Sequence, residues 1–350
     1  MKKCGCYDPG YILGQLTGIQ NGRAVNNWLQ EEMKKVPSLA EHAPLDEKSA
    51  AWMGSAAGGE GIQDLFSMSR AEIPGLERGA DLALEIKGAQ GLKTMLETFL
   101  SLLSANVRLI NLIVPSLEAE VFEAKAHLSM RLLRAILISL GSDALLAADS
   151  TDGRVDKTSW WGNTQNEAQL VYNDDLPRVL VQCLNDGDAS ILSDWAGMLR
   201  LPATNVAYFN YLSGDVFQEE AHYYPALAVS LALSGLPGLN GLAVNGNLAQ
   251  VRRLMEARQK SSVFHPASAQ MVVQVDRRVF ALMKISPDAL ETALCLVNLS
   301  AERVHLTPDA AELGLPKSGW QDLVSGEPAR LDESGITLEG YGAAWLSHAI

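Results

Sequence analysis

The chain has 350 residues, a formal net charge of -13 and a hydrophobic fraction of 47%. A chain of this length forms one large domain with an appendage or two domains, and its apolar content is enough to bury a core. The negative charge argues against binding to nucleic acid, which needs clustered Lys and Arg, and against binding to an anionic membrane surface.

The sequence carries no signal for a membrane span or for secretion. No apolar stretch approaches the roughly 20 residues that cross a bilayer, and no apolar signal-peptide core follows Lys2 and Lys3. We therefore expect a cytoplasmic protein that has neither a membrane partner nor a nucleic-acid partner.

The four cysteines predict neither a disulfide framework nor a metal centre. Cys183 and Cys295 lie in apolar runs, as core thiols do, and Cys4 and Cys6 lack a second pair or histidines that would complete a metal site. His127 lies in an amphipathic helix and is interpreted as a packing residue. No glycine-rich nucleotide fingerprint is present, so the sequence predicts no metal and no cofactor.

Residues 1–75 form an atypical N-terminal segment. A short helix is expected over residues 25–35, while residues 50–61 are small and glycine-rich and are typical of a loop or linker. The alternation of strands and helices that marks the rest of the chain is not recognisable here.

From about residue 81 the pattern changes to strands that alternate with helices. Strands are expected over residues 82–86, 107–114, 144–148 and 205–212. Helices are expected over residues 92–104, 118–140, 175–185, 189–199, 222–234 and 248–260. This alternation predicts βαβ units with parallel pairing, an α/β fold.

After His265 and Pro266 the pattern becomes all-β. Short alternating strands are separated by turn residues, and they cover residues 270–275, 279–286, 293–299, 302–306, 320–323, 336–338 and 343–346. Residues 264–350 are therefore predicted to form a small antiparallel β-sandwich.

The stretch from 145 to 173 carries the clearest chemical signal. An apolar run stops at Asp149, and a polar loop with Trp160 and Trp161 follows. In a parallel sheet the residue at the carboxyl end of a strand faces the ligand site. A carboxylate there, followed by two indole rings, suggests sugar chemistry. The alternative is a polar strand end with two half-buried tryptophans.

Several motifs extend this interpretation across the chain. They are WGN at 161–163, NEAQLVYN at 166–173, NYLSGD at 210–215, LPG at 236–238 and CLVNLS at 295–300. These motifs resemble the sucrose and glucosylglycerate phosphorylase branch of glycoside hydrolase family 13, the α-amylase superfamily. The resemblance implies a (β/α)8 TIM barrel over 76–263, altered or incomplete at its N-terminal side, before the β-domain.

The chain departs from that family at its catalytic positions. The resemblance places Ile113 at the position of the aspartate nucleophile and Asn111 at that of the neighbouring arginine. The acid/base position falls on Asp149, which is one methylene shorter than the family's glutamate. The third carboxylate is kept as Asp215, with Gly214 where the family has a histidine.

The same resemblance gives the expected sugar-binding residues and leaves catalysis open. The substrate-binding candidates are Asn111, Trp160, Trp161 and Asn210. Retaining transfer needs a nucleophile and an acid/base roughly 5–5.5 Å apart, and an isoleucine cannot attack carbon.

Two hypotheses follow for the function. In the first, family catalysis is lost and the chain acts as a sugar-binding or protein-interaction module, with phosphate binding and homo- or hetero-oligomerisation left open. In the second, Asp149 and Asp215 form a rebuilt site in an active α-glucoside hydrolase or phosphorylase.

Overall fold

The computed structural model describes residues 12, 19–36, 82–83, 88–105, 107, 109–114, 120–150, 156–200, 205–213, 216–240, 248–266, 268–308, 313–332 and 334–349. The described residues up to Tyr172 form one compact unit, and those from Asn173 onward form another. Most of the N-terminal segment 1–75 lies outside the described residues. The limits proposed for the barrel region, 76–263, and for the β-domain, 264–350, stay predictions.

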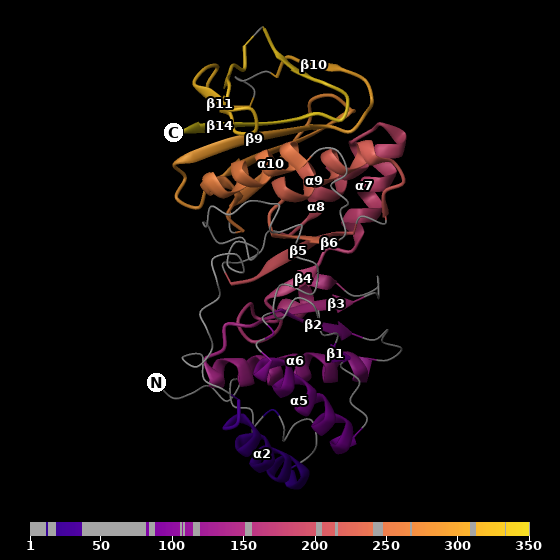
Figure 1. Ribbon diagram of the computed structural model, residues 1–350, viewed down its shortest axis with the longest axis vertical. Helices are drawn as coiled ribbons and strands as arrows, with labels where there is room; N and C mark the ends of the chain where they lie inside the picture. The colour runs from indigo at the N-terminus through magenta and orange to yellow at the C-terminus, as the bar shows by residue number, and fades with distance from the viewer. Residues whose placement is uncertain are drawn as a thin grey trace. The chain divides into compact units, whose positions relative to one another are not determined.

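The described part of the first unit is built on a parallel sheet. Its strands, in both chain order and sheet order, are β1 (Leu82–Ala83), β2 (Leu109–Val114), β3 (Leu145–Ser150) and β4 (Leu170–Tyr172). Its longer helices are α2 (Ile19–Met33), α5 (Gly88–Ser104) and α6 (Glu120–Leu140). Helix α5 lies beside β1, and α2 packs against α5 (Figure 1).

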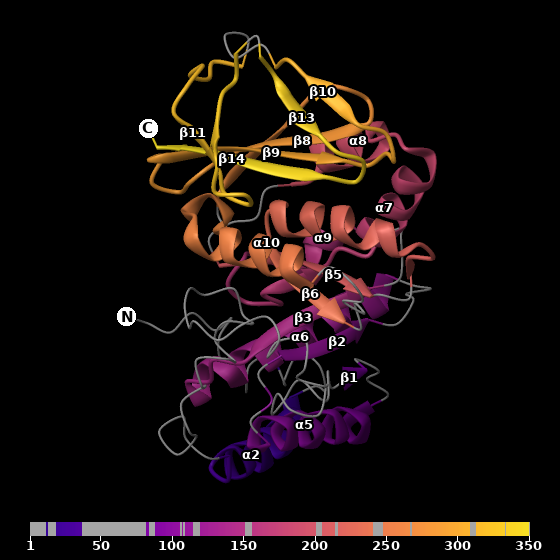
Figure 2. The same cartoon turned by 45° about the horizontal axis from the view of Figure 1, so that its top comes forward.

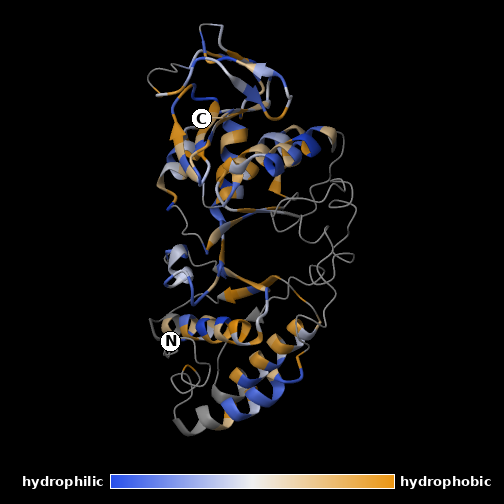
Figure 3. Cartoon of the chain, turned by 90° about the vertical axis from the view of Figure 1, so that its left-hand side faces the viewer, coloured by the Kyte–Doolittle hydropathy of each residue, from blue (hydrophilic) through white to orange (hydrophobic). Residues whose placement is uncertain are grey.

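The helices of this unit contain both apolar and polar residues, as their mixed colouring in Figure 3 shows. In α5 the buried residues recur every three or four positions, which is the spacing of one helix face. They are Leu92, Leu96, Phe99 and Leu103. In β2, Ile110 and Leu112 alternate on one face and are fully buried. Within the described residues, the helices predicted over 92–104 and 118–140 and the strands predicted over 107–114 and 144–148 are confirmed, whereas α2 begins earlier than predicted and β4 was not predicted.

The second unit begins with helices and a parallel strand pair. Strand β5 (Ala207–Ser213) pairs in parallel with β6 (Leu236–Asn240), and α9 (Tyr223–Ala232) connects them. The remaining helices are α7 (Asp175–Asp186), α8 (Ser190–Met198) and α10 (Leu248–Lys260), with short 3-10 turns η4 (Glu220–His222) and η5 (Ser262–Phe264).

The C-terminal part of this unit is all antiparallel, as predicted. One sheet has the order β12-β11-β14-β9-β8-β7, and β10 pairs with β13 in a second, smaller sheet. The strands are β7 (Ala269–Val273), β8 (Val279–Ile285), β9 (Glu291–Asn298), β10 (Val304–Leu306), β11 (Trp320–Asp322), β12 (Pro328–Ala329), β13 (Ile336–Leu338) and β14 (Ala343–Ala349).

The larger sheet is covered on both faces. Phe280 and Cys295 join a core with the helices, whereas Ala281 and Leu296 join a core with Leu338 of the smaller sheet. Figure 2 shows α9 and α10 along one face and β10 and β13 on the other. Double burial explains why β8 and β9 read as almost continuous apolar runs.

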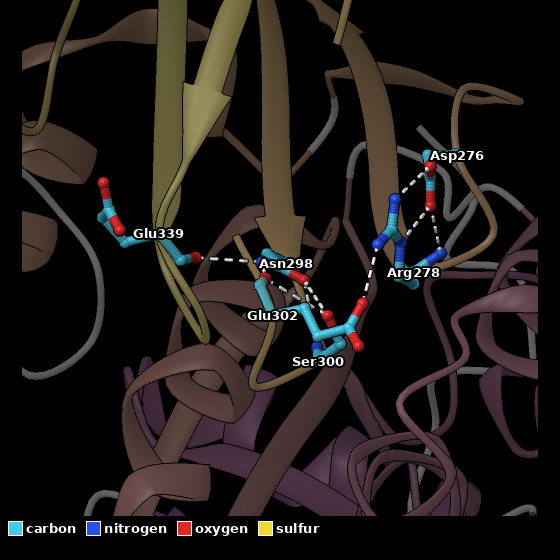
Figure 4. A network of polar contacts seen from close by, with 6 residues as sticks. All are labelled: Asp276, Arg278, Asn298, Ser300, Glu302 and Glu339. Carbon is cyan, nitrogen blue, oxygen red and sulfur yellow. Dashed lines mark hydrogen bonds and ion pairs between the residues drawn. The ribbon is translucent and has the colours of Figure 1, made fainter. Parts of the chain in front are cut away.

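A polar network fastens the turns of the β-domain (Figure 4). Buried Asn298 donates to the carbonyls of Glu302 at 2.6 Å and Glu339 at 2.9 Å, and its Oδ1 accepts from the Ser300 amide at 3.0 Å. Arg278 binds both carboxylate oxygens of Asp276 at 2.9 Å, and its hydrogen bonds lower the pKa of that carboxyl to about 2. The network gives the CLVNLS motif a structural role.

Candidate functional site

The carboxyl ends of β2 and β3 bring two of the predicted catalytic positions together. Ile113 is paired in register with Asp149, and Ala83 of β1 is paired with Ile113 on its other side. Adjacent strands lie about 4.8 Å apart, so the backbone of Ile113 lies about one strand spacing from that of Asp149. The side chain of Asp149 is partly exposed.

This register determines which chemistry the three paired residues can perform. Of Ala83, Ile113 and Asp149, only the aspartate can exchange a proton or carry charge. A retaining site needs a second carboxylate at roughly the distance that Ile113 occupies. An aliphatic side chain, Ile113, thus lies beside Asp149 on the neighbouring strand, and the assignment of this pair to a catalytic site stays a prediction.

Asn111 lies two residues before Ile113 on the same face of β2. Its Oδ1 is buried and has no hydrogen-bond partner among the described residues. Leaving a buried acceptor unsatisfied costs about 1–3 kcal/mol, and such atoms often mark a site for water or a ligand. Asn111 and Asp149 thus present acceptors on neighbouring strands, as a ligand with hydroxyl groups would require.

The two tryptophans follow in the 3-10 turn η2 (Lys157–Trp161), which Asp156 caps through the Thr158 amide at 2.9 Å. Both indole side chains are buried, Trp160 completely. The Trp160 ring stacks on His127 with a centroid distance of 4.4 Å. A sugar would reach either ring only after this turn moved, so their role as a sugar platform stays a prediction.

A buried ionic cluster, which the sequence did not reveal, anchors the end of this loop. The buried Glu167 side chain lies 2.5 Å from His127 Nδ1 and 2.8 Å from Arg131 Nε. His127 and Arg131 are one turn apart on α6, so both face the same point. The cluster ties residues 156–169 to α6, which ends just before β3. His127 is therefore more than the packing residue that its helix pattern suggested.

The available signal for this cluster was the four-residue spacing of His127 and Arg131. The pairing with Glu167, 36 to 40 residues later, required the fold. Gly162 completes the arrangement because its φ is +54° and a Cβ there would lie 2.7 Å from Glu167 Oε1. Only glycine fits both the backbone conformation and the space.

In the second unit, Asn210 of β5 is completely buried and its amide is engaged by the protein. Its Oδ1 accepts from Asn173 Nδ2 at 3.0 Å, and its Nδ2 donates to the Ser234 carbonyl at 3.3 Å. Its predicted contact with a sugar stays a prediction. Asp215 and Gly214 lie outside the described residues, so the proposed pairing of Asp149 with Asp215 also stays a prediction.

Comparisons with known proteins bear on the identity of this fold. No protein-family model matches the chain. A glucosylglycerate phosphorylase of Spirochaeta thermophila is 24% identical over 333 residues, covering 65% of this chain and 57% of that protein. One from Allomeiothermus silvanus is 35% identical over 88 residues, covering 25% of this chain and 16% of that protein. The chain therefore spans less than three fifths of the length of these relatives.

Solved structures agree on the architecture. An α-amylase from H. orenii superimposes with a TM-score of 0.61 at 12% identity, covering 75% of this chain and 65% of that one. A cyclic α-maltosyl-(1→6)-maltose hydrolase from Arthrobacter globiformis gives 0.55 at 17% identity, covering 74% and 60%. The chain is similar to glucosylglycerate phosphorylases in sequence and to α-amylases in fold, and both findings support a phosphorylase-like relationship to glycoside hydrolase family 13. The predicted fold class, a partial barrel followed by an antiparallel β-domain, is confirmed.

The described residues meet the requirements of neither a metal site nor a membrane-spanning helix. Groups of three or more His, Cys, Asp or Glu side chains placed to hold a metal ion do not occur in the part of the chain that the structure describes. Within that same part, every helix is too short or too polar to cross a membrane.

Proposed function

We propose that this chain binds a small α-glucoside and does not catalyse the glucosyl transfer of its relatives. The observation that carries the proposal is the register of Ile113 beside Asp149. In retaining transfer, a carboxylate oxygen forms a bond to the anomeric carbon as the bond to the leaving group breaks. Ile113 supplies no lone pair for that step, and loss of a covalent nucleophile lowers the rate by several orders of magnitude.

Binding does not need the missing nucleophile. Asn111 Oδ1 and the Asp149 carboxylate are hydrogen-bond acceptors on adjacent strands, and sugar hydroxyls are matching donors. Because relatives are named for glucosylglycerate, we take this glucoside as the first ligand to test. We further propose that the protein is cytoplasmic, in keeping with the buried, unbridged thiols of Cys183 and Cys295.

The competing function is an active α-glucoside hydrolase or phosphorylase that uses Asp149 with Asp215. It rests on the partly exposed carboxylate of Asp149 at a strand end. An inverting pair would need these carboxylates roughly 6.5–9.5 Å apart. Replacing Asp149 by Asn separates the two functions, because it abolishes turnover in the second.

The test is calorimetric titration and thermal unfolding with glucosylglycerate, sucrose, glucose and phosphate. A ligand at about 100 times its Kd stabilises the native state by roughly 2.7 kcal/mol. We expect one of the glucosides to stabilise the chain, Asn111→Leu to weaken that binding, and the exposed control Asp194→Asn to leave it unchanged. If none of the sugars bound, the proposal would be wrong, and the search would turn to protein partners, with light scattering to detect self-association.

A further inference from the structure

A lysine lies in the core of the second unit. Lys284 of β8 is completely buried and is paired in register with Gln270 of β7 and Ala293 of β9. Its Nζ donates to Ser234 Oγ at 3.0 Å. Among the described residues no carboxylate lies within ion-pair distance of this amine. Its hydrogen-bond partner there is the Ser234 hydroxyl.

The groups that face Lys284 do not compensate a positive charge. Arg258 of α10 donates to the carbonyls of Leu231 and Gly235, the latter at 2.8 Å, and adds a second cation. Cys295 of β9 is buried, and burial raises the pKa of its thiol to about 12, so it is neutral.

Acidic side chains on the surrounding elements are engaged by other groups or exposed, and Asp322 of β11 accepts from the Trp345 amide at 3.0 Å. The carboxylate of Glu291, on the same face of β9, accepts from Ser261 at 2.7 Å, Ser262 at 2.9 Å and Ser347 at 2.6 Å. Asp194 of α8 is exposed. Strand β7 and turn η5 contribute no ionisable side chain to this region.

Ser234 connects this amine to three other residues, two of them at or just before the start of β7 and one on β5. Its Oγ donates to the Ser268 carbonyl at 3.3 Å, its amide donates to Gln270 Oε1 at 2.8 Å, and its carbonyl accepts from Asn210 Nδ2 at 3.3 Å. Lys284 and Ser234 therefore join the β-domain to the segment from β5 to β6 (residues 207–240, the β5–β6 segment) through one continuous buried network.

We propose that Lys284 is a proton-dependent lock between the C-terminal β-domain and the β5–β6 segment. With a neutral amine the Lys284–Ser234 hydrogen bond holds Ser234 against β7 and β8. Protonation places an ammonium in a dry interior beside Arg258, and the segment around Ser234 loosens to admit water. The proposal is independent of whether the chain binds a sugar.

The sign of the pH dependence follows from burial. Burial lowers the pKa of Lys284 to about 7, with the neighbouring Arg258 acting in the same direction, whereas its ordinary value is 10.5. Between these two values the unfolded chain binds more protons, so the free energy of unfolding rises with pH from about 7 to 10.5. Below pH 7 the buried ammonium exerts its full destabilising effect.

The first test observes the native chain directly. Lysine 13Cε chemical shifts are followed by NMR as a function of pH, with Lys284→Met used to assign the signal. We expect a midpoint near 7 for Lys284, together with loss of hydrogen-exchange protection at the Ser234 amide below that midpoint. A midpoint above 10, or unchanged protection of Ser234 across the midpoint, would overturn the proposal.

The second test compares variants. Lys284→Met should raise Tm at pH 6, and its advantage over the wild type should shrink as the pH rises to 10. Lys260→Met, an exposed lysine at the end of α10, serves as the control and should follow the wild-type profile. A Lys284→Met chain that folds but keeps the wild-type pH profile would contradict the lock.

Discussion

Each unit of this protein buries an ionisable side chain, and the two are stabilised in different ways. Glu167 in the first unit lies between His127 and Arg131, whereas Lys284 in the second unit has a serine hydroxyl as its hydrogen-bond partner. A buried charge persists when opposite charges and hydrogen bonds offset its lost hydration. Without them, the group gives up its charge instead.

The comparison separates a fixed anchor from a conditional one. The Glu167 cluster holds the loop after the Asp149 strand, and removing any member should weaken the native state. The Lys284–Ser234 bond holds the β-domain against the β5–β6 segment only while the amine is neutral. Below pH 7, replacing Lys284 by an apolar residue should therefore stabilise the native state, whereas replacing a member of the Glu167 cluster should destabilise it.

The largest effect is expected at Arg131. Arg131→Met removes the guanidinium beside the buried Glu167 carboxylate, and such a loss costs about 3 kcal/mol. Urea unfolding followed by fluorescence measures the change. The control is Arg134→Met, one turn along α6, which loses a long 3.4 Å contact with the Gln165 carbonyl and should cost under roughly 1 kcal/mol. Equal losses in the free energy of unfolding at both positions would show that the Glu167 cluster does not anchor the loop.

Gly162→Ala should be the next most disruptive change. The new Cβ would lie 2.7 Å from Glu167 Oε1 on a backbone with φ of +54°, so both strain and displacement of the carboxylate follow. We expect a loss of about 2 kcal/mol. Gly141→Ala is the matched control, because its φ of +63° is similar but the added Cβ meets nothing within 4 Å. If the two variants unfolded at the same urea concentration, the loop would not depend on the Glu167 contact.

A smaller effect is expected at Ser234. Ser234→Ala removes the hydroxyl that accepts from Lys284 and should destabilise the native state by about 1 kcal/mol while raising the Lys284 titration midpoint, because the lost bond favours the neutral amine. Ser230→Ala is the control, since this buried serine bonds the Asn210 carbonyl at 3.2 Å and does not contact the lysine. An unmoved midpoint in Ser234→Ala would show that the hydroxyl does not tune the amine.

Periodicity predicted most of the framework, because runs of apolar residues determine which segments bury a face. Strand β13 and helix α10 match their predicted limits, and the register of β2 with β3 pairs Ile113 with Asp149. Strand β3 differs at its end. The apolar run predicted a stop before Asp149, whereas pairing with β2 continues through Ser150 and includes the aspartate in the strand.

The parts that the sequence could not supply are long-range polar pairings. Short β4 (Leu170–Tyr172) has too few residues to show a period, and helix α2 begins at Ile19 rather than near 25. A lysine near the end of an apolar strand is expected to point into solvent, yet α10 and the residues around Ser234 cover Lys284. No local pattern records such covering, because the partners lie 26 to 50 residues away in the chain.

We propose that Ile113 occupies the place of the nucleophilic carboxylate. The direct measurement is incubation of the pure chain with glucosylglycerate and phosphate at a concentration where calorimetry shows the site occupied, followed by detection of the glucosyl phosphate product. We expect the binding site to be occupied and the amount of glucosyl phosphate to stay at the level of a protein-free control. Product that appears with the wild type and disappears in Asp149→Asn would contradict it and establish an active enzyme.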